Sequence, residues 1–197
     1  MRHDLRLEGR AFRLRPVEPK DAGFIAALRR DPRAAGRLHP VSGLVDDQVA
    51  WIQAYLGRAE DWYWIVESRR SDLPEGTLGL WRADDVPGRA QWGRWVLRAG
   101  SLAAPESALL LYRAAFEELG LRAVYCRTVA ANRAVVSFHD RAGLDRAGVV
   151  TGAFQFGATP IDAVEHELTR DGWPATRAIL EASAAAVALL IDREAGR

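Results

Sequence analysis

The chain has 197 residues, of which 49% are hydrophobic, so it suits one soluble domain with a substantial core and leaves little room for two independent domains. Its 27 basic residues nearly balance its 26 acidic residues, giving a formal net charge of +1. A chain this close to neutrality lacks the positive excess that holds a nucleic-acid backbone, so we expect no nucleic-acid partner.

The expected location is the cytoplasm. The single cysteine, Cys126, can form no disulfide within the chain, and the first residues, Met1 to Arg10, lack the apolar core of a signal peptide. The longest apolar stretch near the C-terminus, Ala182 to Ile191, is shorter than the roughly 20 residues that span a bilayer. We therefore expect no membrane segment and interpret this stretch as a packed helix.

The first third of the chain predicts one strand followed by two helices. The strand is expected at Ala11 to Val17, where apolar and basic residues alternate with period two. Asp21 is a plausible N-cap for the first helix, which Asp31 and the following proline stop. The second helix ends at Gly57 and carries apolar residues on one face: Val49, Ile52, Tyr55 and Leu56.

The middle of the chain changes character. Three aromatic and β-branched segments, separated by turn residues, predict an antiparallel meander: Trp62 to Ser68, Thr77 to Ala83 and Ala90 to Arg98. A periodic helix is then expected from Pro105 to Leu119, followed by a strand at Ala123 to Val129. Strand, helix and strand in this order indicate a right-handed crossover and a parallel pair.

The last third predicts a helix at Arg133 to Ala142 and two further strands, Val149 to Phe156 and Ala163 to Leu168. A final helix begins at Trp173 and the proline after it, and places an apolar stripe along one face: Leu180, Ala184, Val187 and Ile191. Such a stripe must pack on its own domain or on a second copy. We expect a domain over residues 1–170, with residues 171–197 as a helical extension that favours a homodimer.

The segment between Ala104 and Leu144 contains several short matches to the sequence pattern of one known protein family. Glu106 occupies the place of the Glu in a family ATEA motif, Phe116 to Leu121 match FEELGL, Asn132 follows the next strand, and Gly143 with Leu144 stands for a Gly-Phe pair. This segment resembles the GNAT superfamily, especially its ribosomal-protein-alanine and amino-sugar N-acetyltransferases. The order of the predicted elements is also that of the GNAT fold.

The resemblance implies a mixed α/β (α+β) fold, with a central, mostly antiparallel twisted sheet flanked by helices. It implies acetyl-CoA as cosubstrate, no metal, and a small-molecule amine as acceptor, with an amino sugar slightly preferred. It assigns cofactor contacts to one strand, the loop after it and the next helix but one: Trp95, Val96, Leu97, Gly100, Ser101, Leu102, Ala103, Ala104, Asn132, Phe138 and Arg141. A main-chain N–H near Val96 or Leu97 would polarise the thioester carbonyl.

The loop expected to bind pyrophosphate departs from the family pattern, because Arg98 to Ala104 is shorter and contains only one glycine, Gly100. Its small residues still leave backbone N–H groups accessible at a helix N-terminus, where the dipole favours an anion. Pro105 suits the first turn of that helix because its missing N–H is not needed there. An ordinary loop before a buried helix is the alternative.

Two residues are candidates for catalysis. His139 stands where many family members carry a tyrosine that protonates the leaving thiolate, and an imidazole with a pKa of roughly 6.5 could do so as an imidazolium. Glu106 ranks below it as a base, since a first-turn carboxylate also stabilises its helix. The family's usual glutamate is replaced by Gln91, so Glu67, Asp84, Asp85 or water remain alternatives.

Acceptor specificity is expected from Arg37 to Gly43 and from tryptophans of the meander: Trp62, Trp64, Trp81 and Trp92. Two other functions stay open. A protein N-terminal acetyltransferase would have a broad open groove, and a sensor that binds acyl-CoA without transfer would fit the atypical loop and Gln91. Fold alone does not decide between them.

Overall fold

The computed structural model describes residues 3–32, 44–83 and 86–195, and these form one eight-stranded sheet in the order β1-β2-β3-β4-β5-β6-β8-β7. The strands are β1 (Leu7–Glu8), β2 (Phe12–Pro16), β3 (Asp61–Ser68), β4 (Pro74–Trp81), β5 (Arg89–Leu97), β6 (Ala123–Val129), β7 (Asp145–Phe156) and β8 (Thr159–Thr169). Neighbouring strands run antiparallel except β5 and β6, which are parallel. The predicted mixed, mostly antiparallel sheet is confirmed.

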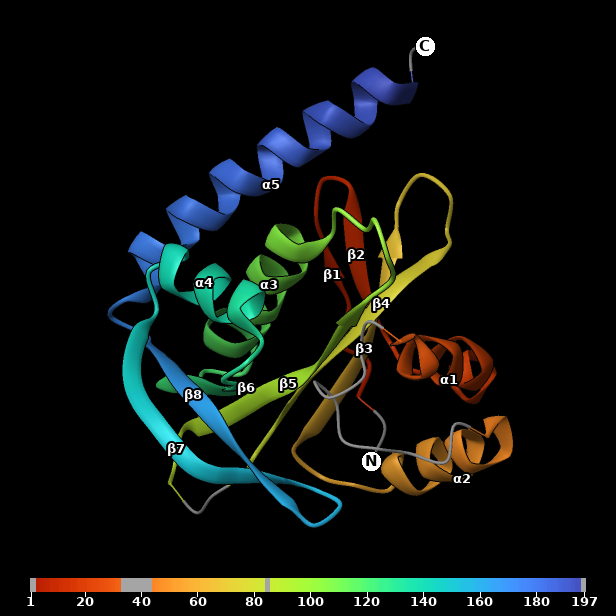
Figure 1. Ribbon diagram of the computed structural model, residues 1–197. Helices are drawn as coiled ribbons and strands as arrows, with labels where there is room; N and C mark the ends of the chain where they lie inside the picture. The colour runs from red at the N-terminus through yellow and green to blue at the C-terminus, as the bar shows by residue number, and fades with distance from the viewer. Residues whose placement is uncertain (1–2, 33–43, 84–85, 196–197) are drawn as a thin grey trace.

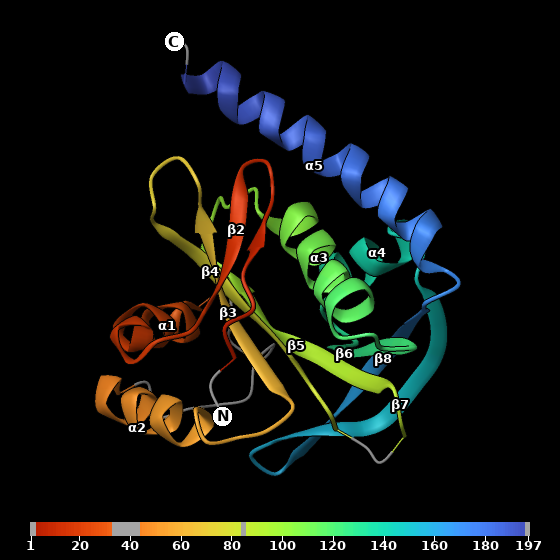
Figure 2. The same cartoon turned by 180° about the vertical axis from the view of Figure 1, so that it is seen from behind.

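Helices cover both faces of this sheet. They are α1 (Ala22–Arg30), α2 (Val45–Tyr55), α3 (Ala104–Arg113), α4 (Arg133–Arg141) and α5 (Trp173–Ala195), with a 3-10 turn (Pro19–Asp21) before α1 and a π-helix (Ala114–Glu118) after α3. In Figures 1 and 2, α1 and α2 lie beside the N-terminal strands, while α3, α4 and α5 lie together on the other side.

Strand β3 illustrates how the sequence separates two cores. Because successive side chains of a strand point to opposite faces, Trp64 and Val66 join the large cluster around α3, whereas Tyr63 and Ile65 join a smaller cluster. The smaller cluster is completed by α1 and α2 through residues such as Ile52. All five residues are 0–3% exposed, so each face of the sheet has its own packed apolar layer.

Most predicted elements occur within a few residues of their expected positions, and the strand Ala123–Val129 has the expected bounds. Three features differ. The two-residue strand β1 was not predicted, and the expected helix Pro105 to Leu119 changes to π geometry at Ala114. Strands β7 and β8 both begin four residues early, at Asp145 instead of Val149 and at Thr159 instead of Ala163. Asp21 also makes no side-chain cap, because its carboxylate binds the guanidinium of Arg15 at 2.8 Å.

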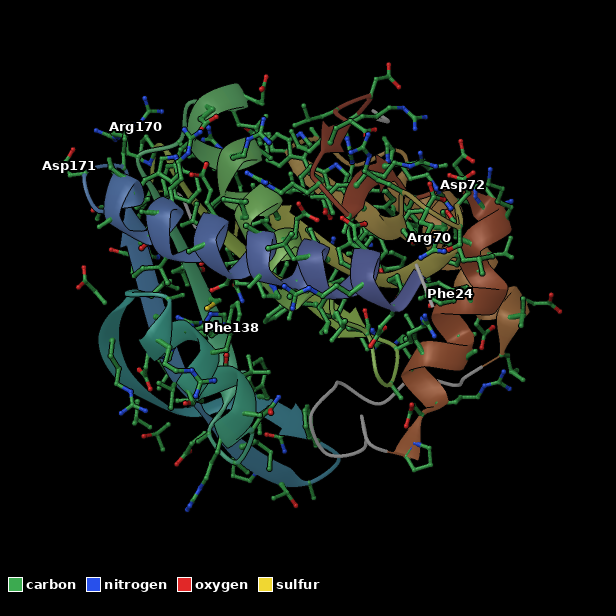
Figure 3. The ribbon with its side chains drawn as sticks, turned by 90° about the horizontal axis from the view of Figure 1, so that it is seen from above. Phe24, Arg70, Asp72, Phe138, Arg170 and Asp171 are labelled. Atoms are coloured by element: carbon green, nitrogen blue, oxygen red, sulfur yellow. The ribbon has the colours of Figure 1, made fainter. Side chains whose placement is uncertain are left out.

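The apolar stripe of α5 packs on its own domain. Leu180 and Ala184 are 2% and 1% exposed, and Val187 and Ile191 contact the same large core cluster. Seen from above, α5 lies across α3 (Figure 3). By length and composition α5 could also cross a membrane, with 17% of its most apolar window buried, which is weak evidence for a membrane span. The stripe is used within the domain, so it no longer argues for a homodimer.

Glu106 anchors the beginning of α3 to the turn between β1 and β2. Its carboxylate is 2% exposed and accepts hydrogen bonds from the backbone N–H groups of Arg10, Ala11 at 2.9 Å and Phe12 at 2.8 Å. A Cβ on Gly9 would lie 2.5 Å from the Glu106 carboxylate, so this turn requires glycine there. The carboxylate therefore ties together segments almost a hundred residues apart.

We predict that Glu106→Ala lowers the free energy of unfolding by about 3 kcal/mol, because it leaves three N–H groups, of which that of Phe12 is buried, without their acceptor. Glu118→Ala, which removes an exposed carboxylate at the end of the π-helix, should change it by less than about 0.5 kcal/mol. Urea denaturation of both variants measures the difference. Equal effects would show that the three hydrogen bonds contribute little.

Candidate functional site

The sheet opens between β5 and β6. Their parallel register runs only from Arg89 opposite Ala123 to Trp92 opposite Cys126. Beyond this point β5 continues to Leu97 along β4, and β6 continues to Val129 along β8. The facing edges of the two strands therefore present backbone groups that another extended molecule can pair with.

A bulge in β5 lies where the strands part. Thr77 and Gly79 of β4 pair with Val96 and Gly93 of β5, so β5 contains one extra residue. Arg94 has a φ of 51°, which is uncommon for a side chain other than glycine, and its carbonyl accepts a 2.7 Å hydrogen bond from Thr77 Oγ1. The strand bends here without losing its attachment to β4.

A cavity of about 570 Å³ occupies this opening. It is lined by residues from α1, β4, β5, β6, α4 and β7: Leu28, Arg29, Asp31, Trp81, Gln91, Trp92, Gly93, Arg94, Trp95, Val96, Leu97, Ala99, Cys126, Arg127, Thr128, Val129, Asn132, Ala134, Val135, His139, Phe154 and Phe156. Residues from distant parts of the sequence thus meet at one cleft of a size typical for small-molecule sites.

The structure brings five of the residues expected from sequence to this cavity: Trp95, Val96, Leu97, Asn132 and His139. Trp95 is held by a 3.1 Å hydrogen bond from Nε1 to Ser107 Oγ, at the start of α3. The carbonyl of Asn132 accepts hydrogen bonds from the first turn of α4 at 3.1 Å, and the residue lines the cavity.

The other expected cofactor-binding and catalytic residues lie outside the cavity lining. Phe138 packs its ring against Trp95 at 5.1 Å between centroids, and Figure 3 labels it beside α4. Arg141 is exposed and donates to Ser137 Oγ at 3.0 Å. Glu106 is occupied by the β1–β2 turn.

The expected phosphate loop lies between β5 and α3. Gly100 has a φ of 74°, which favours glycine, and Ser101 Oγ accepts a hydrogen bond from the Ala103 N–H at 3.3 Å. Ala103 is buried, Ser101 and Ala104 are half-buried, and Leu102 is 37% exposed. The first N–H groups of a helix have no acceptor within it, so Ala104 and Glu106 begin α3 with donors that suit an anion.

His139 is almost enclosed by aromatic rings. It is 2% exposed, its ring centroid lies 5.3 Å from Trp92 and 5.2 Å from His166, and its Nδ1 has no hydrogen-bond partner among the described residues. His166 is fully buried and its Nε2 lies 3.0 Å from Asp140 Oδ1. His139 is thus the buried titratable ring at the cavity, with a carboxylate-bound histidine behind it.

The pKa of His139 is lowered to about 3, mainly by burial and secondly by the nearby His166, against the opposing effect of Asp140. His139 is therefore neutral at neutral pH. The prediction of an imidazolium, which assumed an unperturbed pKa, is wrong because the ring is desolvated. The sequence alone does not reveal this burial. A neutral ring can donate or accept one hydrogen bond but carries no positive charge.

The alternative proton acceptors are also occupied or outside the described residues. Burial alone would raise the pKa of Glu67, but the guanidinium groups of Arg15 and Arg13 lower it overall. Gln91 accepts a 3.2 Å hydrogen bond from the Tyr125 hydroxyl. Asp84 and Asp85, like the expected acceptor segment Arg37 to Gly43, lie outside the described residues. Within the described part of the chain, no cluster of three or more metal-binding side chains occurs.

The far end of the cavity contains residues that the sequence did not identify as functional. Arg94 crosses over β4 to Asp61 of β3, where its guanidinium forms two hydrogen bonds of 2.5 and 3.0 Å. Trp81 was expected here, but Phe154 and Phe156 of β7 were not. One sequence signal marks the bulge: two tryptophans three residues apart, at positions 92 and 95, break the alternation of β5 yet join the same core cluster.

Because His139 stays neutral until about pH 3 in the folded chain but takes up a proton near pH 6.5 when unfolded, it stabilises the fold above pH 6.5 and loses this contribution as pH falls. Between pH 7.5 and 5.0 the free energy of unfolding should fall by up to about 2 kcal/mol from this residue. Urea denaturation of wild type and His139→Gln at both pH values measures it. An equal fall in the two proteins would contradict a buried neutral ring.

Comparison with known proteins agrees with this architecture. The Acetyltransferase (GNAT) domain family matches residues 11–145, which is more than half of the chain. No curated protein matches the chain. Among solved structures, apo FdhC, described as a nucleotide-linked sugar GNAT, is 26% identical with a TM-score of 0.75, over 89% of this chain and 96% of its own.

Two more distant structures share the fold. A GCN5-related N-acetyltransferase from Brucella melitensis is 18% identical with a TM-score of 0.79, over 91% of this chain and 85% of its own. A variant of the spermidine N-acetyltransferase SpeG from Vibrio cholerae is 14% identical with a TM-score of 0.72, over 84% and 97%. With its parted parallel strands, its bulge and the family match together, the chain belongs to the GNAT family of acetyltransferases.

Proposed function

We propose that the protein transfers the acetyl group of acetyl-CoA to a primary amine of a small molecule, with an amino sugar as the preferred class. The observation that carries this proposal is the cavity between the parted strands β5 and β6, which joins cofactor-type contacts at α4 to an aromatic and polar region beside α1 and β7. The similarity to a nucleotide-linked sugar GNAT supports the acceptor class.

Acetyl-CoA would lie along the open edge of β5. The Arg98 N–H donates to Glu75 of β4 at 2.8 Å, and N–H groups alternate in direction along a strand, so the Leu97 N–H points toward the opening. We assign this N–H, ahead of that of Val96, to the thioester carbonyl. The pantetheine arm would pair with β5 and contact Asn132, with the pyrophosphate at Gly100 to Ala104.

The reaction forms one bond and breaks another. The lone pair of an uncharged amine nitrogen attacks the thioester carbonyl carbon, and the N–H of Leu97 stabilises the negative charge that develops on oxygen. Collapse of the tetrahedral intermediate re-forms the carbonyl and breaks the carbon–sulfur bond. The nitrogen loses one proton and the departing CoA sulfur gains one, so the products are the acetamide and CoA thiol.

His139 would assist this step as a neutral hydrogen-bonding ring at the leaving sulfur. Its lowered pKa disfavours a stored proton at neutral pH, so the proton that the sulfur gains is the one released by the amine nitrogen. Glu106, which already accepts three backbone hydrogen bonds, would act by holding the loop and α3 in place and not as the base. This arrangement requires the acceptor to arrive uncharged.

Four finer expectations remain predictions. The cytoplasmic location follows the sequence argument alone. A homodimer would need the outer face of α5, where Ile179, Leu189 and Leu190 are 42–58% exposed, because the inner stripe is already packed. The alternative acceptor is a protein N-terminus, and the alternative role is an acyl-CoA sensor. The size of the cavity and its aromatic lining favour a small acceptor over a protein chain.

We predict that acetyl-CoA binds in the micromolar range, roughly −8 kcal/mol, and that thiol is released with glucosamine faster than with spermidine or an alanyl peptide. Calorimetry and a thiol assay measure the two properties. Asn132→Ala should weaken binding about tenfold, since the enzyme loses a side-chain hydrogen bond to the pantetheine arm, whereas the exposed Gln53→Ala should not. Absence of CoA and acetyl-CoA binding at millimolar concentration would overturn both the enzyme and the sensor.

We predict that His139→Ala lowers kcat by roughly 10²-fold while acetyl-CoA affinity stays nearly intact, because the lost contact forms as the sulfur departs. His139→Gln should retain more activity, since an amide also donates a hydrogen bond. The kcat of wild type should show no ionisation of His139 between pH 6 and 9. An unchanged kcat in His139→Ala at saturating substrate would make the residue purely structural.

A further inference from the structure

Beside the cavity, strands β4 and β5 each contain a glycine. Each glycine leaves room for a large side chain of the other strand to lie over it. A Cβ on Gly79 of β4 would lie 3.2 Å from Cδ and Nη1 of Arg94, so the Arg94 side chain passes over this position. A Cβ on Gly93 of β5 would lie 3.0 Å from the Trp81 ring. Trp81 and Arg94 thus each occupy the space above a glycine of the neighbouring strand.

This interlock holds the Arg94 guanidinium in one place. Nη1 and Nη2 bind the two carboxylate oxygens of Asp61, whose side chain is only 8% exposed. The guanidinium carbon also lies 4.5 Å from the centroid of Trp81 and 5.4 Å from those of Trp51 and Tyr63. A guanidinium group that is bound at both terminal nitrogens and lies among aromatic rings loses little entropy when it makes a further hydrogen bond.

The charge of this group is only partly compensated, because Arg94 and Arg58 share the carboxylate of Asp61. Asp61 pairs with Arg94, and Arg58 lies 3.7 Å from the same carboxylate, while Arg29 and Asp31 also line the cavity. Burial lowers the pKa of Arg29, and the nearby charge of Arg94 adds to this lowering against the opposing effect of Tyr63. An ammonium group placed here would meet two guanidinium groups, so a polyamine is disfavoured.

We propose that Arg94, held by Asp61 and Trp81, is a specificity-determining residue that selects a neutral, hydroxyl-bearing ring as the acceptor. Its remaining N–H groups donate to hydroxyl or ring oxygens, and the Trp81 indole packs against the apolar face of the ring. Pairing a stacked aromatic with a fixed polar fork matches a sugar, which alternates C–H surface with hydroxyl groups. This inference rests on the proposed function and names the residue that distinguishes its acceptor classes.

The backbone conformation at Arg94 supports a functional role for this residue. Its φ of 51° costs energy in a residue with a side chain, and such strain persists where the surrounding contacts enforce it. The Thr77 hydroxyl and the Asp61 carboxylate supply that enforcement from two different strands. Because the same bulge aims Arg94 at one face and Trp95 at the other, acceptor and cofactor contacts are set by adjacent residues.

The test compares Arg94→Gln with Arg82→Gln, an exposed arginine of the same region that pairs with Glu60. In Arg94→Gln, kcat/KM for glucosamine should fall at least tenfold relative to kcat/KM for spermidine, because sugar hydrogen bonds are lost and the carboxylate of Asp61 becomes available to an ammonium. Arg82→Gln should leave the ratio unchanged. Equal losses for both acceptors in Arg94→Gln would overturn the proposal.

A second measurement needs no turnover. Calorimetry in the presence of CoA should show N-acetylglucosamine binding at least tenfold more weakly to Arg94→Gln than to wild type, with CoA affinity equal in the two proteins. Equal affinity for N-acetylglucosamine would overturn the role of Arg94. Failure of wild type to acetylate any amine, with this affinity difference present, would instead overturn the proposed function and support sugar recognition.

Discussion

The structure depends on one interruption in hydrogen bonding, the point where β5 and β6 stop pairing after Trp92 and Cys126. A continuous sheet would bury both strand edges and leave no backbone donors or acceptors for a ligand. Here each strand stays attached to its other neighbour, so the opening costs only the pairing between the two parted edges. The bulge at Arg94 keeps β5 attached to β4 while β5 bends away from β6, which makes the cavity a property of the sheet and not of a loop.

The two faces of the sheet contribute different groups of side chains around this opening. On the side of α3 and α4, Trp95 is bound to the helix start through Ser107, and His139 is buried among rings that keep it neutral. On the side of α1 and α2, Arg94 and Asp61 form a charged pair within an aromatic cluster. An acyl donor and an acceptor approaching from opposite faces would meet at the strand edge, where orientation of the reacting atoms is rigidly defined.

Local patterns predicted most of the fold, because period-two and period-3.6 spacing record which face of a strand or helix is buried. The same spacing does not show whether a polar residue has a structural or a catalytic role, because that depends on its contacts in the fold. From the sequence, Glu106 is only a carboxylate in the first turn of a helix. Its three hydrogen bonds depend on the β1–β2 turn, which lies next to it in the folded chain. The charge state of His139 depends on rings contributed by β5 and β8, and the partner of Arg94 lies thirty-three residues away on β3. Long-range contacts of this kind leave no local trace.

The interlock of β4 and β5 limits how this site can change over evolutionary time. The Arg94 side chain lies over Gly79 and the Trp81 side chain lies over Gly93, so each large side chain depends on the absence of a Cβ on the neighbouring strand. Changes at such touching positions are not additive: a larger residue at either glycine requires the facing side chain to shift or to be replaced by a smaller one. A change of acceptor that alters Arg94 or Trp81 therefore also changes which residues fit at the facing glycine, and these four positions should vary as two coupled pairs instead of four independent choices.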